Sequence, residues 1–360
     1  MEVQEVITKR QQKAFLDFRK KFYQDNAVYV DNFYFMLQEL FAKKTSFVKD
    51  KKIHAFNILE GETIVCQGIV VHAKALPRYI QLCFLESLPG QKAAVEKLVE
   101  KTIELGKQYQ CEKLVIGLNG HVNYGLGLLC SHYEEKNSFS AAVNPAYYHD
   151  YFAGLGLEKI YLNTYHTRLD YSRLKRYDSI LRKLEKHYTY RTFDRKEFDT
   201  YAKIYTDLNN EAFADHRYYY KRTYEEDKEM LKELFLFMKE DSIIFAFQGE
   251  KPVGFVMWYP DFNELAKAGE AFGAKHFFKN LVYGKKITTG KIMEYGVLKG
   301  YRKSGLVIGL LDQVFAAIKK RGIRSIRSSW ILEENRDSNS VCQALCDEIH
   351  KRYVVYEKEI

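Results

Sequence analysis

The sequence predicts a mixed α/β fold with two tandem domains, each built on a mixed, mostly antiparallel sheet flanked by helices. Two apolar segments joined by a short glycine-containing turn occur twice, around residues 60–62 and around residues 249–251, and each pair is typical of a β-hairpin. Each hairpin is followed by a strand, an amphipathic helix and another strand, an order that favours parallel neighbours in the same sheet. Because this order repeats at about half the chain length, we expect two domains of one plan.

The length of 360 residues fits two domains of ordinary size. Apolar residues make up 46% of the chain and charged residues 29%, which is typical of a folded globular protein. We expect an N-terminal domain over residues 1–172, a charged linker helix over 173–186 and a C-terminal domain over 187–360.

The first half contains the elements of one complete domain. Its long helix has apolar residues at three- and four-residue spacing, as in Val95, Leu98 and Val99, and Gly106 lies near its end, where a C-terminal glycine is common. The expected elements are helices over 11–21 and 33–42, strands over 52–59, 64–71 and 80–85, a helix over 93–109 and a strand over 113–118.

The second half repeats this series. Its long helix carries Leu310, Leu311 and Val314 on one face and is followed by Gly322. The expected elements are helices over 198–213 and 225–238, strands over 242–247, 252–258 and 292–298, a helix over 306–321 and a strand over 325–332.

Composition and charge exclude several classes of protein. The net charge of +9 arises from 56 basic and 47 acidic residues that are mixed along the chain, so we do not expect nucleic acid as a partner. No apolar run approaches the roughly 18 residues of a membrane span, and the N-terminus lacks a signal pattern, so we expect a cytoplasmic protein. The six cysteines lack metal-ligand spacing, and we expect reduced thiols and no metal.

The most informative segment is the basic turn between an apolar strand and the helix that starts near Leu306. Successive backbone N–H groups at such a turn, together with the positive end of a helix, form a natural site for an anion. Gly305 allows the backbone to approach a phosphate closely. This order of strand, turn and helix indicates a nucleotide-type cofactor.

The segment resembles the pyrophosphate loop of the GNAT superfamily of acyltransferases, which has the pattern Arg/Gln-x-x-Gly-x-Gly/Ala. The strand that ends at Asn335 and the helix that begins near Asn339 resemble the pantetheine-side strand and the closing helix of that family. An Asn-Pro-x-Tyr-Tyr segment over 144–148 is similar to one in bacterial tandem GNAT-like proteins, so the resemblance extends over nearly the full length. The loop positions are Arg302, Lys303, Ser304, Gly305, Leu306 and Val307, the last standing where the family has a small residue.

The resemblance implies that acetyl-CoA or another acyl-CoA binds to the C-terminal domain as a co-substrate. The loop over 302–307, Asn335 and Asn339 would hold it, and backbone N–H groups at Val297 and Leu298 would bond its pantetheine arm and polarise the thioester. At the matching turn the first half has Glu86 and no basic residue. Because an acid there would repel a pyrophosphate, we expect the N-terminal domain to be degenerate for cofactor binding and to serve packing or form one wall of a cleft.

The resemblance also implies roles in catalysis. Glu294, on the strand before the loop, is the candidate general base. Many GNAT enzymes have a tyrosine seven residues after the asparagine of the closing helix, where it can protonate the departing sulfur. Counting from Asn339 gives Cys346, which is therefore the candidate acid. Substrate-binding candidates are Tyr295, Trp258 and Asp261, with Asp261 placed to hold a cationic amine.

The leading hypothesis is an acyl-CoA-dependent N-acyltransferase that acts on a small amine or an amino-acid-like acceptor. One alternative is a non-catalytic binding or scaffold protein, because Val307 and Cys346 depart from the family pattern. The other is an aminoacyl transferase of the tandem-GNAT kind that uses charged tRNA. The sequence does not define the acceptor or the oligomeric state.

Overall fold

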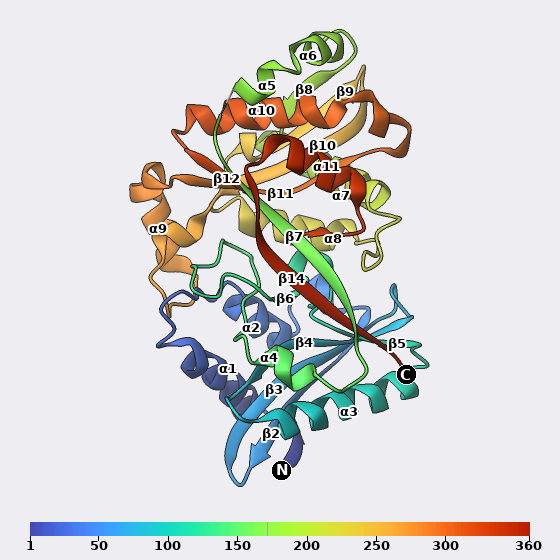
Figure 1. The fold of residues 1–360 in the computed structure, drawn as a ribbon, viewed down its shortest axis with the longest axis vertical. Helices are drawn as coiled ribbons and strands as arrows, with labels where there is room; N and C mark the ends of the chain where they lie inside the picture. Colours follow the sequence, from blue (N-terminus) through green and yellow to red (C-terminus); the bar gives the residue numbers. More distant parts are fainter. Residues whose placement is uncertain (171) are drawn as a thin grey trace.

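The computed structural model describes residues 1–170 and 172–360, and its strands join into one long sheet with helices packed against it (Figure 1). The strands are β1 (Glu2–Glu5), β2 (Lys51–Glu60), β3 (Thr63–Ala73), β4 (Tyr79–Ser87), β5 (Lys113–Ile116), β6 (Leu128–Leu129), β7 (Glu158–Arg168), β8 (Thr189–Thr192), β9 (Ile243–Gln248), β10 (Lys251–Pro260), β11 (Thr289–Val297), β12 (Ser325–Ser328), β13 (Ile331–Leu332) and β14 (Glu348–Glu359). The helices are α1 (Lys9–Tyr23), α2 (Tyr34–Ala42), α3 (Lys92–Gln108), α4 (Tyr148–Phe152), α5 (Ser172–Lys175), α6 (Asp178–Leu184), α7 (Phe198–Ala212), α8 (Tyr224–Leu234), α9 (Ala274–Tyr283), α10 (Leu306–Lys320) and α11 (Arg336–Leu345).

The sheet is mixed and mostly antiparallel, as predicted. Its main strand order is β1-β2-β3-β4-β5-β14-β7-β12-β11-β10-β9-β8. Within the described residues, β4 with β5 and β11 with β12 are the parallel pairs, and each is bridged by one long helix, α3 or α10. The predicted hairpins are β2–β3 and β9–β10. The fold class is therefore confirmed, and the two halves repeat the same order of elements.

The last strands of the two halves cross between them. Although β14 ends the chain, it pairs with β5 of the first half through Tyr356 and Ile116. Although β7 ends the first half, it pairs with β12 and β13 of the second half. The strands β7 and β14 also pair with each other along much of their length, between the two halves in Figure 1. The sheet is thus continuous, and the boundaries at 172 and 187 remain a prediction about sequence units.

The predicted linker helix over 173–186 is instead the two short helices α5 and α6. Leu174 of α5 and Leu184 of α6 are buried in the apolar cluster formed around α10. Ile180 of α6 lies beside the basic turn, where its Cγ2 atom is 3.1 Å from the position that a Cβ on Gly305 would take. The linker therefore packs on the second half.

Two apolar clusters cover the opposite faces of the second half's sheet. Phe255, Met257 and Tyr259 of β10 belong to the cluster under α7 and α8. Val256 and Trp258, which alternate with them, belong to the cluster under α10. This alternation, which follows from the period of a strand, identifies the face on which each neighbouring β11 side chain lies. In the described part of the chain, no helix has the length and apolarity needed to cross a bilayer.

Candidate functional site

The strands β11 and β12 separate near the middle of β11 and leave an opening in the sheet. Their pairing ends at Ile292 and Ser328, and the N–H of Ser329 donates one further hydrogen bond to the carbonyl of Ile292 at 2.8 Å. The chain then turns away, and Ile331 pairs with β7 instead. Among the described residues, no strand pairs with the second half of β11 on this side.

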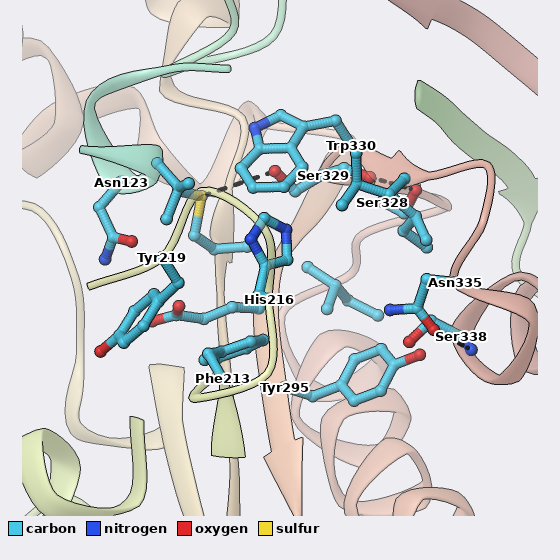
Figure 2. Close-up of a pocket in the computed structure, with 16 residues that line it drawn as sticks. Asn123, Phe213, His216, Tyr219, Tyr295, Ser328, Ser329, Trp330, Asn335 and Ser338 are labelled. Atoms are coloured by element: carbon cyan, nitrogen blue, oxygen red, sulfur yellow. Dashed lines mark hydrogen bonds between the residues drawn. The ribbon is translucent and has the colours of Figure 1, made fainter. Parts of the chain in front are cut away.

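A cavity of about 100 Å³ lies at this opening (Figure 2). Both halves of the chain line it, because Val122 and Asn123 of a short 3₁₀ turn reach it from the first half. The N-terminal half thus forms one wall of the cavity. The other lining residues are Phe213, His216, Tyr219, Ile292, Met293, Glu294, Tyr295, Ser328, Ser329, Trp330, Ile331, Leu332, Asn335 and Ser338.

A β-bulge at Met293 determines which faces its neighbours occupy. Glu294 pairs with Met257, and Lys291 pairs with Tyr259, so that Met293 is the extra residue. Directly paired residues share a face of the sheet, and Met257 and Tyr259 both face α7 and α8. Lys291 and Glu294 therefore also face α7 and α8.

The neighbouring Tyr295 lies on the opposite face. It pairs with Val256, and it packs in the cluster under α10 together with Val341 and Leu345 of α11. Figure 2 shows its ring pointing toward Ser338, while Asn123 and Tyr219 lie on the other side of the cavity. A carboxylate and a phenol thus approach the opening from opposite faces of the sheet.

Glu294 sits over a buried polar network. Its carboxylate accepts a hydrogen bond from the hydroxyl of Tyr205 on α7. Arg222 donates to that hydroxyl at 3.4 Å and forms a 2.6 Å ion pair with Asp227 of α8, in which both side chains are at most 2% exposed. Asn123 accepts from Arg222 at 2.8 and 3.0 Å when its amide oxygen faces the guanidinium.

This network adjusts the acidity of Glu294. Burial raises the pKa of the Glu294 carboxyl above its usual value, while Arg222 and the Tyr205 hydrogen bond act in the opposite direction. A carboxylate with a raised pKa is a stronger base, which suits it to accept a proton from an amine. The sequence analysis singled out Glu294 but none of Tyr205, Arg222 and Asp227, because their convergence requires the packing of α7 and α8 on β11.

The hydroxyl of Tyr295 is buried beside the side chain of Ser338, and no hydrogen bond of standard geometry to it is found among the described residues. Burial is the main cause that raises its pKa, while Ser338 acts in the opposite direction. A buried hydroxyl at the wall of a cavity fits a ligand that accepts its hydrogen bond. Tyr295 is therefore a candidate proton donor as well as the substrate contact predicted from the sequence.

His216 lines the same cavity as a neutral imidazole. Burial lowers its pKa to about 4, with Arg217 contributing in the same direction. Its Nδ1 atom accepts a hydrogen bond from the N–H of Tyr218 at 3.2 Å, which requires the proton of the neutral ring to be on Nε2. This donor was absent from the site residues selected from the sequence.

The basic turn has the shape expected of an anion site. Residues 299–304 form a 3₁₀ helix, and Gly305 adopts φ +81°, a conformation that favours glycine. Lys299 and Lys303 are exposed. The Arg302 guanidinium instead donates to the carbonyls of Val297 at 3.3 Å and Ala212 at 2.8 Å, so it ties the end of β11 to α7.

Two predicted backbone contacts differ in their availability. The N–H of Leu298 donates to the carbonyl of Val253 at 3.0 Å, so it is used within the sheet and is not available to a cofactor. The carbonyl of Val297 accepts from Arg302 on the side of β11 away from β10, which is the side of the opening. The N–H and the carbonyl of a strand residue point to the same side, so the N–H of Val297 also points there. Val297 thus presents its backbone to the opening.

The two asparagines have different surroundings. Asn335 lines the cavity and caps α11 by accepting from the N–H of Ser338 at 3.1 Å. The amide of Asn339 is buried, donates to the carbonyls of Leu332 and Asn335, and accepts from the hydroxyl of Tyr165 at 2.8 Å. The structure therefore makes Asn339 a residue that positions α11 on β7 rather than a direct cofactor contact.

Three further residues selected from the sequence lie outside the cavity. Trp258 is fully buried under α10 and donates to the carbonyl of Asp241 at 2.7 Å, which makes it a core residue. Asp261 is buried and accepts from the N–H groups of Phe139 and Asn263, so it holds a loop rather than an amine. Cys346 follows α11 and is adjacent to Cys342, whose thiol interaction lowers the pKa of Cys346.

The corresponding opening in the first half holds a smaller cavity, of about 40 Å³. The pairing of β4 with β5 ends at Leu82 and Ile116, which matches the end of pairing at Ile292 and Ser328. Beyond it, the N–H of Phe84 donates to the side chain of Asn119 at 3.1 Å, which bridges the gap.

The turn that follows β4 is also covered. Hydroxyls of three tyrosines at or beside α4 bond its backbone: Tyr147 to the carbonyl of Ser87, Tyr148 to the N–H of Ser87, and Tyr151 to the N–H of Gln91. Glu86, which we expected to repel a pyrophosphate at this turn, is buried on β4 and paired with Arg19. Tyrosines and an internal ion pair therefore occupy this turn.

Part of the second half matches a known protein family. Residues 199–346 match the model of the Acetyltransferase (GNAT) family. Protein YghO of Escherichia coli (strain K12) is 28% identical over 190 residues, which cover 50% of this chain and 48% of YghO. The match thus spans about half the length of this relative.

Solved structures share the fold of both halves together. A tandem GNAT protein from the clavulanic acid biosynthesis pathway superposes with a TM-score of 0.58 and 14% identity, covering 99% of this chain and 98% of that one. A conserved protein of unknown function from Enterococcus faecalis V583, described as a probable N-acyltransferase, gives a TM-score of 0.55 and 9% identity, covering 100% and 72%. At these identities the similarity is one of fold.

Proposed function

We propose that this chain, which carries a GNAT-family domain within a two-domain GNAT-like fold, is an acyl-CoA-dependent N-acyltransferase for a small amine acceptor. The single observation that supports this most directly is the opening beside β11, with Glu294 on one face of the sheet and Tyr295 on the other. This arrangement separates a proton acceptor from a proton donor across the place where a thioester would lie.

The residues at the opening fit an acyl-CoA. The backbone of Val297 faces the opening, the Tyr295 hydroxyl is buried at the wall of the cavity, and Gly305 shapes a basic turn at the start of α10. Val297 would bond the pantetheine arm, and the turn over 302–307 would hold the phosphates with Lys303 at its exposed side. The bound acyl-CoA would supply an activated acyl group.

The chain's own residues then manage the protons. As the amine nitrogen forms its bond to the acyl carbon, Glu294 accepts the proton that the nitrogen loses. As the carbon–sulfur bond breaks, Tyr295 donates a proton to the departing sulfur. We assign this role to Tyr295 in place of Cys346, because Tyr295 lines the cavity and Cys346 does not.

Two measurements test the proposal. Release of free thiol from acetyl-CoA is followed with a panel of primary amines, and the melting temperature is recorded with and without acetyl-CoA. We expect turnover with at least one amine and a higher melting temperature, with the shift reduced by Lys303→Glu and kept by Lys320→Glu, an equal charge change at the far end of α10. A melting shift without turnover on any amine would favour a non-catalytic binding protein. The absence of both turnover and a melting shift would overturn the proposal.

A further inference from the structure

A second, smaller cavity between the two halves is lined by cationic side chains. It shares the segment Ser328–Trp330 with the cavity at Glu294, so this segment is a common wall. None of the described residues that line it is a carboxylate. Its polar lining consists of Lys291, Arg327, His350, Lys351, Ser138, Thr164, Ser328 and Ser329.

The two lysines are buried without a carboxylate at hydrogen-bond distance. Lys291 and Lys351 are 3% and 4% exposed. The ammonium of Lys291 donates to the carbonyl of Phe139 at 2.7 Å, and that of Lys351 donates to the carbonyl of Glu135 at 2.9 Å. Burial lowers the pKa of each lysine to about 8, against the opposing effect of a nearby carboxylate, Asp261 for Lys291 and Glu135 for Lys351.

Arg327 completes the excess of positive charge. Its Nη1 atom donates to the hydroxyl of Ser138 at 3.2 Å and lies 3.7 Å from the carboxylate of Asp261, while its buried Nε has no partner among the described residues. Asp261 already accepts from two backbone N–H groups. The three cations Lys291, Arg327 and Lys351 thus outnumber the two nearby carboxylates, Asp261 and the Glu135 that pairs with His350, and this excess fits a ligand that brings a negative charge.

The bulge at Met293 connects this cavity to the proposed reaction. It places Lys291 and Glu294 on the same face of β11, opposite Tyr259 and Met257, which are two residues apart, or roughly 7 Å along a strand. An acceptor whose amine reaches Glu294 can therefore hold an anionic group near Lys291 only if several bonds separate the two. The cavity measures about 20 Å³, which leaves no room for a group as large as a phosphate.

We propose that Lys291, Arg327 and Lys351 form a carboxylate subsite, and that the acceptor is a linear amino acid whose reactive amine lies several bonds from its carboxylate. This inference rests on the proposed function for the identity of the reaction. The subsite itself is a binding site that can be tested without turnover.

Turnover is tested with 6-aminohexanoate and with its uncharged amide, 6-aminohexanamide. With the wild-type protein we expect a kcat/KM roughly 10- to 100-fold higher for the carboxylate, the range expected for hydrogen bonds to a charged group. Lys291→Met should remove most of this preference while leaving the amide's kcat/KM within about threefold. Lys320→Met, an exposed lysine on α10, should keep the preference. Equal kcat/KM values for the two compounds in the wild-type protein would overturn the subsite and leave the acyltransferase proposal standing.

Binding is tested by calorimetry with hexanoate, which has the carboxylate but no amine. A carboxylate beside lysines whose pKa is about 8 raises that pKa, so binding near pH 8 should take up protons, visible as a dependence of the heat on the buffer's ionisation enthalpy. Lys351→Met, a second variant in case Lys291→Met does not fold, should weaken binding roughly tenfold. Binding without amine turnover would retain the subsite and remove the enzyme, and no hexanoate binding in the wild-type protein would overturn the subsite.

Discussion

Replacing Lys291 by methionine should change how the stability of the protein depends on pH. The ammonium of Lys291 is 3% exposed, and burial lowers its pKa from 10.5 to about 8. A lysine whose pKa is lowered by folding binds its proton more weakly in the native state than in the unfolded state. It therefore destabilises the native state below about pH 8, and this penalty disappears as the pH rises through the native pKa toward 10.5.

The size of the effect follows from the shift. A difference of about 2.5 pKa units corresponds to about 3 kcal/mol at low pH, since one unit is about 1.4 kcal/mol. Between about pH 7.5 and about pH 10, roughly 2 kcal/mol of this penalty is relieved. The free energy of unfolding of the wild-type protein, measured relative to Lys291→Met, should rise by that amount over this range. The variant also loses the hydrogen bond from Lys291 to the carbonyl of Phe139. This loss is the same at every pH, so it does not contribute to the change between the two pH values.

The assay is urea denaturation of both proteins at a series of pH values, with Lys320→Met as the control. Because Lys320 is exposed at the end of α10, its variant should follow the wild-type protein at every pH. A difference between the wild-type protein and Lys291→Met that stays constant within about 0.5 kcal/mol over the range would refute the reasoning, since it would mean that Lys291 is ionised at little cost.

Three further predictions concern the network around the cavity. Glu294→Gln should lower kcat roughly 10²- to 10⁴-fold in the thiol-release assay, and a variant within threefold of wild type would exclude the base role. In the wild-type protein, kcat should fall as the pH is lowered through a pKa above the usual glutamate value. Tyr295→Phe should lower kcat at least tenfold while Cys346→Ser leaves it unchanged, and the reverse ranking would restore the cysteine as the acid. Arg222→Met should lower the free energy of unfolding by about 3–5 kcal/mol in urea denaturation because it leaves Asp227 buried and unpaired. The double variant Arg222→Met/Asp227→Leu should recover most of the loss, and a single variant as stable as wild type would show that the pair is not ionised.

Local patterns in the sequence were sufficient for the order of elements. The hairpins β2–β3 and β9–β10 and the helices α3 and α10 were predicted within a few residues, because hydrophobic period and turn glycines act over short distances. The same patterns located the turn at Gly305, and the family resemblance of the segment pointed to Glu294 and Tyr295, which line the cavity. They did not distinguish core residues from site residues. Trp258, for example, was selected as a substrate-binding residue but is buried in the core.

The predicted closing-helix contacts show why residue type alone was insufficient. Asn339 has the residue type of the family pattern, but its amide is used by β7 and the turn before α11. The alternation of an ideal strand would put Lys291 and Glu294 on opposite faces, and the bulge at Met293 reverses this. A bulge is defined by the partner strand, which local sequence does not specify.

The sequence by itself determined two mixed α/β halves and a basic glycine turn before a helix, since these depend on residues close together in the chain. Only the tertiary structure decided that β7 and β14 cross between the halves, that Arg222 and Tyr205 support Glu294, and that Lys291, Arg327 and Lys351 converge beside the cavity. These contacts join segments that are far apart in sequence. They arise when apolar faces are buried together, and burial also shifts the pKa values on which the proposed chemistry depends.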